Sequence, residues 1–210
     1  MVSGTSAGAV NTVVIASRSR LLHVGVAELE QVWRNFRSAE VFKSDASTMF
    51  RNTLRWAYAV LTGSLGGHDS LALLDNSPLR ELLSTRVNFG AIQEAIDAGY
   101  VDGVSITAAG YSSSRSVAFY QGCEEVDPWL RVRRVGRRTR LTLDHVMASI
   151  AVPIVFPPVR IGHEYFGDGA MRQATPLSPA VHLGAERILV VGVRNEHPDL
   201  PAEGDPAYPS

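Results

Sequence analysis

The sequence predicts an α/β domain with a mostly parallel sheet and helices on both of its faces. Segments with the apolar spacing of helices alternate along the chain with short apolar runs bounded by turn residues. The segment over 187–193 contains the continuous apolar run Ile188 to Val191, as expected for a strand buried inside a parallel sheet. Near the start, Gly4–Gly8 leads into an apolar stretch that is typical of a helix entered from a strand. This alternation is the pattern of a layered α/β fold.

Length and composition favour one globular domain. The chain has 210 residues, of which 45% are hydrophobic and 20% charged, an ordinary globular composition. The net charge of −1 argues against general nucleic-acid binding. We expect a single domain over 1–197 and a proline-rich, irregular tail over 198–210.

The single cysteine and the hydropathy pattern indicate in which cellular compartment the protein is expected. Cys123 has no second cysteine with which to form an internal disulfide, which fits a reducing environment. Met1 is not followed by a basic region and a long apolar run, and no window is apolar enough to span a membrane. We therefore expect a cytoplasmic protein, with at most peripheral membrane contact.

Apolar spacing predicts a series of helices in the first half of the chain. They are expected over 7–18, 25–37, 47–62, from Asn76 to about Leu83, and over 89–98. The helix over 25–37 should bury one stripe of side chains, consisting of Val26, Leu29, Val32, Trp33 and Phe36. Pro78 suits a first helical turn, and Gly99 suits a helix end.

Strands and short helices alternate in the second half. Strands are expected over 103–111 and 116–121, a helix over 143–150, a hairpin over 155–166 that turns near Gly162 and His163, a helix over 176–183, and a strand over 187–193. Thr142 should cap the helix over 143–150, and Gly184 should close the one over 176–183.

Ser6 is the first candidate for chemistry. In the pattern Gly-x-Ser-x-Gly, Gly4 and Gly8 let a strand and a helix pass closely around a sharp turn that carries the serine. The helix N-terminus then directs backbone N–H groups, here that of Ala7, at whatever the serine attacks. The alternative interpretation of the same letters is a loop rich in glycine and serine.

Asp168 is the second candidate. It follows an expected strand, and the flanking Gly167 and Gly169 should leave its side chain exposed. A serine hydroxyl is a poor nucleophile until a base removes its proton, and a carboxylate within hydrogen-bond reach can be that base. The alternative interpretation is an ordinary Asp-Gly turn.

Together these motifs resemble the patatin-like phospholipase family. Its signature is Gly-x-Ser-x-Gly with a distant Asp-Gly-Gly or Asp-Gly-Ala, here Gly4–Gly8 and Asp168-Gly169-Ala170. The segment from Ala148 to Pro158 looks like that family's Ala-Ser-x-x-x-Pro-x-x-Phe-x-Pro. Pro176-Leu177 and the stretch over 184–191 are also similar to the family's pattern after the aspartate.

The resemblance implies a three-layer patatin-like fold and a Ser–Asp dyad. Ser6 would be the nucleophile and Asp168 the proton acceptor in hydrolysis of lipid or phospholipid acyl esters through an acyl-enzyme. No metal or organic cofactor is needed for this chemistry.

One family element has no counterpart in the sequence. The family carries a glycine-rich oxyanion segment upstream of the serine, whereas only Met1, Val2 and Ser3 precede Gly4. We therefore expect a fragment that lacks the first strand and the oxyanion loop, with weak activity or none. The glycine-rich loop over 63–67 is a poor substitute because it follows the nucleophile.

Histidines leave a second enzyme class open. An α/β-hydrolase triad would run Ser, acid, His, and His182 and His197 both follow Asp168. His182 falls in an expected helix and His197 in the tail, whereas a triad histidine lies on a loop. An acyl-carrier acyltransferase is a third class, but it usually has His before the nucleophile, where this chain has Thr5.

The remaining histidines favour structural roles. His145 and His163 are expected in packing or at the surface. His68 and Asp69 form an isolated pair in a loop, and no set of residues has metal-ligand spacing.

A cluster of arginines precedes the helix over 143–150. Its members are Arg131, Arg133, Arg134, Arg137, Arg138 and Arg140. One interpretation is a solvated hairpin edge that turns at Gly136. The other is contact with anionic lipid headgroups, in the extreme as a non-catalytic membrane-binding remnant. Aromatic residues on the expected helix over 47–62 fit either a core or a lipid interface; they are Phe50, Trp56 and Tyr58.

Overall fold

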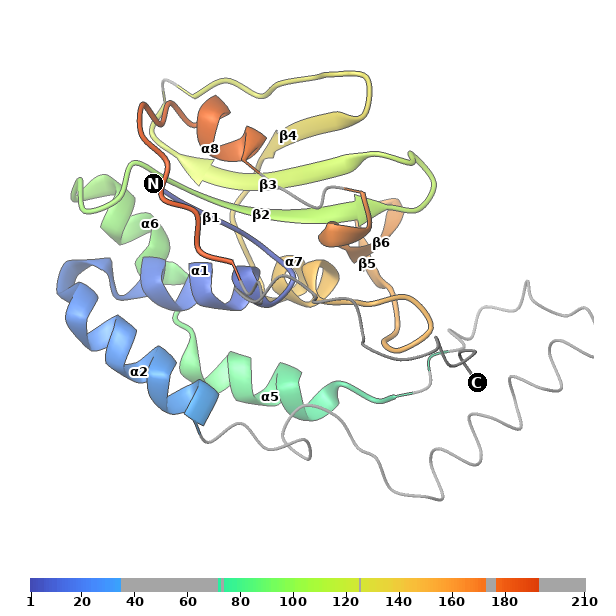
Figure 1. The fold of residues 1–210 in the computed structure, drawn as a ribbon, viewed down its shortest axis with the longest axis horizontal. Coiled ribbons are helices and arrows are strands. Elements are labelled where there is room, and N and C mark those ends of the chain that lie inside the picture. The colour runs from blue at the N-terminus through green and yellow to red at the C-terminus, as the bar shows by residue number, and fades with distance from the viewer. Residues whose placement is uncertain (35–71, 73, 125, 173–176, 193–210) are drawn as a thin grey trace, which may run out of the picture.

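A computed structural model describes residues 1–34, 72, 74–124, 126–172 and 177–192. The helix expected over 47–62, the loop over 63–67 and the pair His68-Asp69 lie outside these ranges. A sheet forms the centre of the molecule (Figure 1), with strand order β4-β3-β2-β6-β5 and with β1 also paired to β2. The strands are β1 (Val2–Thr5), β2 (Gly103–Gly110), β3 (Ser116–Gly122), β4 (Arg134–Arg138), β5 (Val159–Ile161) and β6 (Glu164–Asp168).

The α/β class is confirmed, and the sheet within it is mixed. β1 runs parallel to β2 and β3 parallel to β4, as a parallel sheet requires. The β2–β3, β2–β6 and β5–β6 pairs are antiparallel, so the sheet is less parallel than predicted. For the β2–β3 and β5–β6 pairs the reason is local, since short turns at Ser112–Ser114 and at Gly162-His163 reverse the chain directly and leave no room for a crossover helix.

Helices cover both faces of this sheet. They are α1 (Ala7–Ser17), α2 (Leu22–Arg34), α5 (Ser77–Arg86), α6 (Gly90–Asp97), α7 (Leu143–Ser149) and α8 (Ser178–His182), with short 3₁₀ turns at Ser19–Leu21 and Gly169–Met171. In Figure 1, α1 and α7 lie against one face, α2 and α5 lie beyond them, and α8 lies on the opposite face. All eight residues of β2 are buried because both faces of this strand are covered.

Local signals explain where several helices begin and end. Thr142 and His145 form a capping box at the start of α7, as the Thr142 prediction requires. Pro78 lies in the first turn of α5, and the backbone N–H of Ser77 donates to Asp75 Oδ1 at 2.9 Å. Gly99 and Gly184 adopt φ values of +71° and +95°, which suit the residues just after a helix.

The strand expected over 187–193 is not found in the described part of that segment. Residues 187–192 belong to no strand, and the side chains of Leu189 and Val191 are 90% and 89% exposed. An apolar run becomes a buried strand only where a neighbouring strand supplies backbone partners, and none of the described strands pairs with it.

The stripe expected on the helix over 25–37 is buried only in part. Leu29 packs against the core, but Val26 is 50% exposed and Trp33 is 39% exposed. Among the described elements, α2 packs mainly against α1, which leaves Val26 and Trp33 partly exposed. The Trp33 indole N–H donates to Asn11 Oδ1 at 2.9 Å, which satisfies its polar atom at the surface. Phe36 lies outside the described residues.

The arginine cluster forms a hairpin edge, but its turn differs from the prediction. The Arg131 amide donates to the Arg134 carbonyl at 2.8 Å, which places the turn at Val132 and Arg133. Gly136 lies inside β4, where a Cβ atom would come within 2.2 Å of the Trp129 indole. A glycine here therefore makes room for an aromatic ring instead of forming a turn.

Within the described ranges, no helix combines the length and the apolar character needed to cross a bilayer.

Candidate active site

Ser6 lies on the turn between β1 and α1, as the Gly-x-Ser-x-Gly pattern predicts. β1 is short, but each of its residues pairs with β2, and α1 begins at Ala7 directly after the serine. The Ser6 backbone has φ 55° and ψ −130°, a combination that non-glycine residues rarely adopt. Such backbone strain persists where surrounding contacts impose it, and it often marks a functional site.

The two glycines of the motif have different roles. A Cβ atom at Gly4 would lie 2.2 Å from the Gly8 carbonyl oxygen and 2.3 Å from Thr12 Oγ1. Gly4 is therefore required for β1 to pass α1, as predicted. A Cβ atom at Gly8 would meet nothing within 4 Å, so the steric role predicted for Gly8 is wrong.

Asp168 ends β6 and points its carboxylate at Ser6. The Ser6 hydroxyl donates to Asp168 Oδ2 at 2.6 Å, and the Ala170 amide donates to Oδ1 at 2.8 Å. The register explains the meeting, because β2 pairs with β1 up to Thr107 and with β6 from Ala108 onward. The ends of β1 and β6 therefore meet at one edge of β2.

The aspartate is less exposed than its flanking glycines suggested. Asp168 is only 4% exposed, which contradicts the expectation of an open side chain. Gly169 does not open the site but closes it, since a Cβ atom there would lie 2.2 Å from the Thr107 carbonyl oxygen. The small residue allows the chain to fold tightly against β2 and bring the carboxylate to the serine.

Ser149 is a site residue to which the sequence reasoning assigned no role. Its hydroxyl accepts a hydrogen bond from the Ser6 amide at 3.0 Å and donates one to the Thr107 carbonyl at 2.6 Å. The side chain is fully buried. The only sequence signal was its place in the Ala-Ser-x-x-x-Pro segment. Ser149 ties the nucleophile's backbone to the sheet.

Ala7 presents the first backbone amide of α1. The first N–H groups of a helix have no partner within the helix, and the helix dipole makes them attractive to an anion. The Ser6 amide is occupied by Ser149, and Ala7 is exposed. The Ala7 N–H is therefore the better placed of the two to meet a negative oxygen beside Ser6.

No described histidine hydrogen-bonds to Ser6 or Asp168. His182 stacks on Trp129 with 4.5 Å between ring centroids, and burial together with Arg131 and Arg134 lowers its pKa. Burial lowers the pKa of His145 to about 4, and this side chain belongs to the α7 capping box. His197 lies outside the described residues. In the same ranges, no group of three His, Cys, Asp or Glu side chains is arranged to hold a metal ion.

These observations define an α/β protein in which a serine on a strand–helix turn faces a buried carboxylate. The family model described as patatin-like phospholipase matches residues 1–181. The chain belongs to the patatin-like phospholipase family. A search of curated proteins and a search of solved structures each found no match. At the level of the family, membership makes the chain a lipid acyl hydrolase that acts on lipid esters.

Proposed function

We propose that this chain hydrolyses lipid acyl esters with Ser6 as nucleophile and Asp168 as its base, through an acyl-enzyme. The observation that carries the proposal is the 2.6 Å hydrogen bond from the Ser6 hydroxyl to Asp168 Oδ2. A direct contact of this kind needs no histidine between the two groups. At this distance the carboxylate can accept the hydroxyl proton directly from the serine.

The acylation step follows from this contact. Asp168 takes the proton as Ser6 Oγ attacks the ester carbonyl carbon and forms a tetrahedral intermediate. The intermediate collapses, the bond to the alcohol breaks, and protonated Asp168 returns the proton to the departing alkoxide. The Ala170 amide holds the other carboxylate oxygen, so Oδ2 stays directed at the serine throughout.

Deacylation uses the same groups in reverse. Asp168 removes a proton from water, the resulting hydroxide attacks the acyl carbonyl, and Ser6 regains its proton as the fatty acid leaves. In both steps the Ala7 amide, at the N-terminus of the 11-residue helix α1, can donate to the oxyanion. The burial of Asp168 strengthens these electrostatic interactions by limiting solvent screening.

The first prediction concerns Ser6 itself. Ser6→Ala should abolish both fluorophosphonate labelling and hydrolysis of a short-chain nitrophenyl ester, because the acyl-enzyme can no longer form. Asp168→Asn should lower the turnover by about 10²- to 10⁴-fold, since an amide cannot take the proton. Circular dichroism checks that both variants fold.

Ser17→Ala is the matched control. Ser17 is the last residue of α1, the helix that follows the Ser6 turn. Its hydroxyl donates to the Val14 carbonyl, and its loss should leave labelling unchanged. Hydrolysis that survives in the Ser6→Ala protein at the wild-type rate would show that the dyad is wrong.

A further inference from the structure

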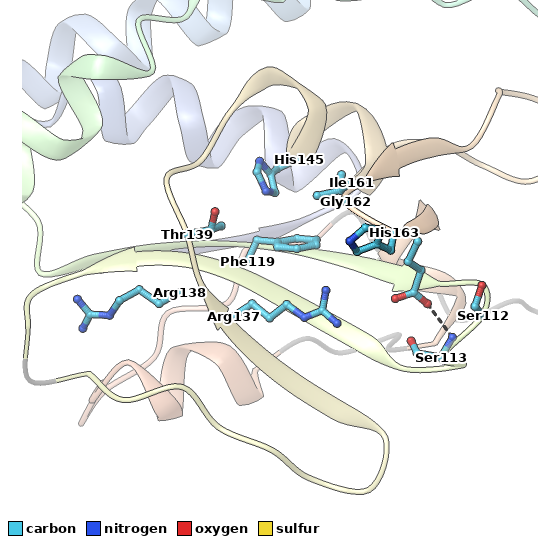
Figure 2. Close-up of a pocket in the computed structure, with 11 residues that line it drawn as sticks. Ser112, Ser113, Phe119, Arg137, Arg138, Thr139, His145, Ile161, Gly162 and His163 are labelled. Atoms are coloured by element: carbon cyan, nitrogen blue, oxygen red, sulfur yellow. Dashed lines mark hydrogen bonds between the residues drawn. The ribbon is translucent and has the colours of Figure 1, made fainter.

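A cavity lies away from the dyad. It has a volume of about 650 Å³ and opens between the β2–β3 turn, β4, the start of α7 and the β5–β6 hairpin (Figure 2). Its wall includes Ser113, Phe119, Arg137, His145, His163 and Glu164, and we call it the Arg137 cleft. Neither Ser6 nor Asp168 lines it.

Arg137 supplies a positive charge to this cleft. It pairs with Phe119 across β3 and β4, so both side chains lie on one face of the sheet. Figure 2 shows its guanidinium directed past Phe119 toward Ser113. The guanidinium makes no hydrogen bond or ion pair with any part of the chain that the structure describes.

The adjacent Arg138 also lines the cleft, but its guanidinium is bonded within the fold. Arg138 points away from Arg137 in Figure 2, and its guanidinium donates to the carbonyls of Cys123 at 2.6 Å and Val126 at 2.7 Å. Through these bonds Arg138 holds the segment around Cys123 and Val126, which precedes β4. Of these two neighbouring arginines of β4, Arg138 is bonded within the fold, whereas Arg137 has no such partner among the described residues.

Two further polar side chains of the cleft, His163 and Glu164, have opposite effects on an anion. His163 lies in the hairpin turn after Gly162, whose φ of +63° permits the tight reversal, and its ring lies beside the open space in Figure 2. Glu164 is the one acidic group among the lining residues, and its Oε1 accepts from the Ser113 amide at 2.7 Å. The carboxylate is thereby held against the β2–β3 turn.

We propose that the Arg137 cleft binds a phosphate group, which Arg137 and His163 hold while Ile161 contacts the organic part of the ligand. A guanidinium offers two parallel N–H donors that match two phosphate oxygens. His145 adds no charge at neutral pH, because burial keeps its pKa at about 4. Arg137 is therefore the principal contact.

This phosphate belongs to a different molecule from the ester at Ser6. Glu164 lines the cleft and Asp168 belongs to the dyad, and the Cα atoms of these two residues, at opposite ends of β6, lie roughly 13 Å apart along that strand. Only a few bonds separate the phosphate and the acyl esters of one glycerophospholipid, which is too short a span. The site therefore serves a second, phosphate-bearing ligand, either a soluble phosphomonoester or the headgroup of a neighbouring lipid.

Binding can be measured on Ser6→Ala protein, so that the result does not depend on hydrolysis. One arm titrates inorganic phosphate by calorimetry, and the other floats the protein with phosphatidylcholine vesicles that contain or lack phosphatidic acid. Arg137→Gln should weaken binding by about tenfold to a hundredfold, and His163→Gln should weaken it less. Glu164→Gln should strengthen it, because a negative charge leaves the cleft.

Arg134→Gln is the matched control, since it removes the same charge from the same strand at a residue that does not line the cleft. If Arg137→Gln weakens binding of inorganic phosphate but not of acidic vesicles, the result supports a soluble ligand. If Arg137→Gln weakens binding to vesicles that contain phosphatidic acid, the result supports a lipid headgroup. Equal losses in the Arg134 and Arg137 variants would overturn the proposal, because they would indicate general surface charge. Absence of binding in both arms would overturn it as well.

Discussion

At the scale of single residues, the chemistry of the site depends on how the Ser6 backbone is held. Its φ of 55° and ψ of −130° are unfavourable for serine, and the Ser149 hydroxyl offsets part of this cost. Ser149 thereby connects three segments that are distant in sequence, namely the nucleophile turn, the end of α7 and the middle of β2.

The second prediction removes this connection. Ser149→Ala should lower the free energy of unfolding by about 1 to 3 kcal/mol, because it leaves the Ser6 amide and the Thr107 carbonyl without this partner in a buried place. It should also lower turnover, since the serine is less firmly placed. Urea unfolding and ester hydrolysis measure the two effects. Ser105→Ala is the control, because it removes a hydrogen bond to Ser3 Oγ on β1. Equal turnover in the Ser149 and Ser105 variants would contradict a positioning role for Ser149.

The third prediction compares the motif glycines. Gly4→Ala should destabilise the fold by about 1 to 3 kcal/mol, because its Cβ atom overlaps the Gly8 carbonyl. Gly8→Ala should be neutral or stabilising by about 0.5 to 1 kcal/mol, since it lies in a helix with open space at its Cβ position. Urea midpoints of the two variants, compared with wild type, decide the matter. A similar loss of stability in both variants would contradict the different surroundings of the two glycines.

The fourth prediction concerns the pH dependence that His145 introduces. Its pKa is about 4 in the folded chain and about 6.5 when unfolded, so the unfolded state binds the proton first as pH falls. The contribution of neutral His145 to the free energy of unfolding is therefore complete above pH 6.5. It is lost as the pH falls from 6.5 through 4, and the loss totals roughly 3 kcal/mol.

His145→Gln tests this linkage, because glutamine at the same position keeps a capping-box acceptor but does not titrate. Stability measured by urea unfolding at pH 7.5 and pH 5 should fall less in the variant than in wild type. A parallel pH dependence of the two proteins would show that other groups control acid sensitivity.

At the scale of elements, the hairpin that leads into β4 shows how a glycine can be misinterpreted. The turn occupies Val132 and Arg133, and Gly136 instead accommodates the Trp129 ring, which stacks on both Tyr120 and His182. This aromatic stack covers the face of the sheet opposite α1 and α7. The edge strand is thus held by ring packing as well as by its ladder with β3.

The fifth prediction follows at this scale. Gly136→Ala should destabilise the fold by about 1 to 3 kcal/mol, because the added Cβ atom would overlap the indole and displace it. Val132→Ala, at a side chain that is 91% exposed, is the control and should change stability by less than about 0.5 kcal/mol. Thermal unfolding compares them. A neutral Gly136→Ala would mean that the Trp129 stack does not hold β4.

At the scale of the whole molecule, β2 organises both the sheet and the candidate site. One edge of β2 receives β1 along its first half and β6 along its second, which places the two motif residues at a common junction. The other edge receives β3, and through it β4 and Arg137. The dyad and the Arg137 cleft are therefore positioned by the same central strand.

Local patterns predicted the elements whose signals lie within a few residues. The helix cap at Thr142, the turn at Gly162 and the helix end at Gly99 depend on local backbone geometry, and each is found where expected. The expected strand over 187–193 is wrong in its described part, because an apolar run does not specify a pairing partner. The burial of Val26 was also overestimated, since helical spacing does not tell which neighbour covers a face.

The sequence by itself determined the residue types of the site, with Ser6 between two glycines and Asp168 beside Gly169, and the family to which these motifs belong. Only the tertiary structure decided that the two side chains meet, although 162 positions separate them in the chain. It also decided the role of Ser149 and the separation of Arg137 from Arg138. The physical reason is that these contacts depend on the register of strands paired across the sheet, which short-range sequence patterns do not encode.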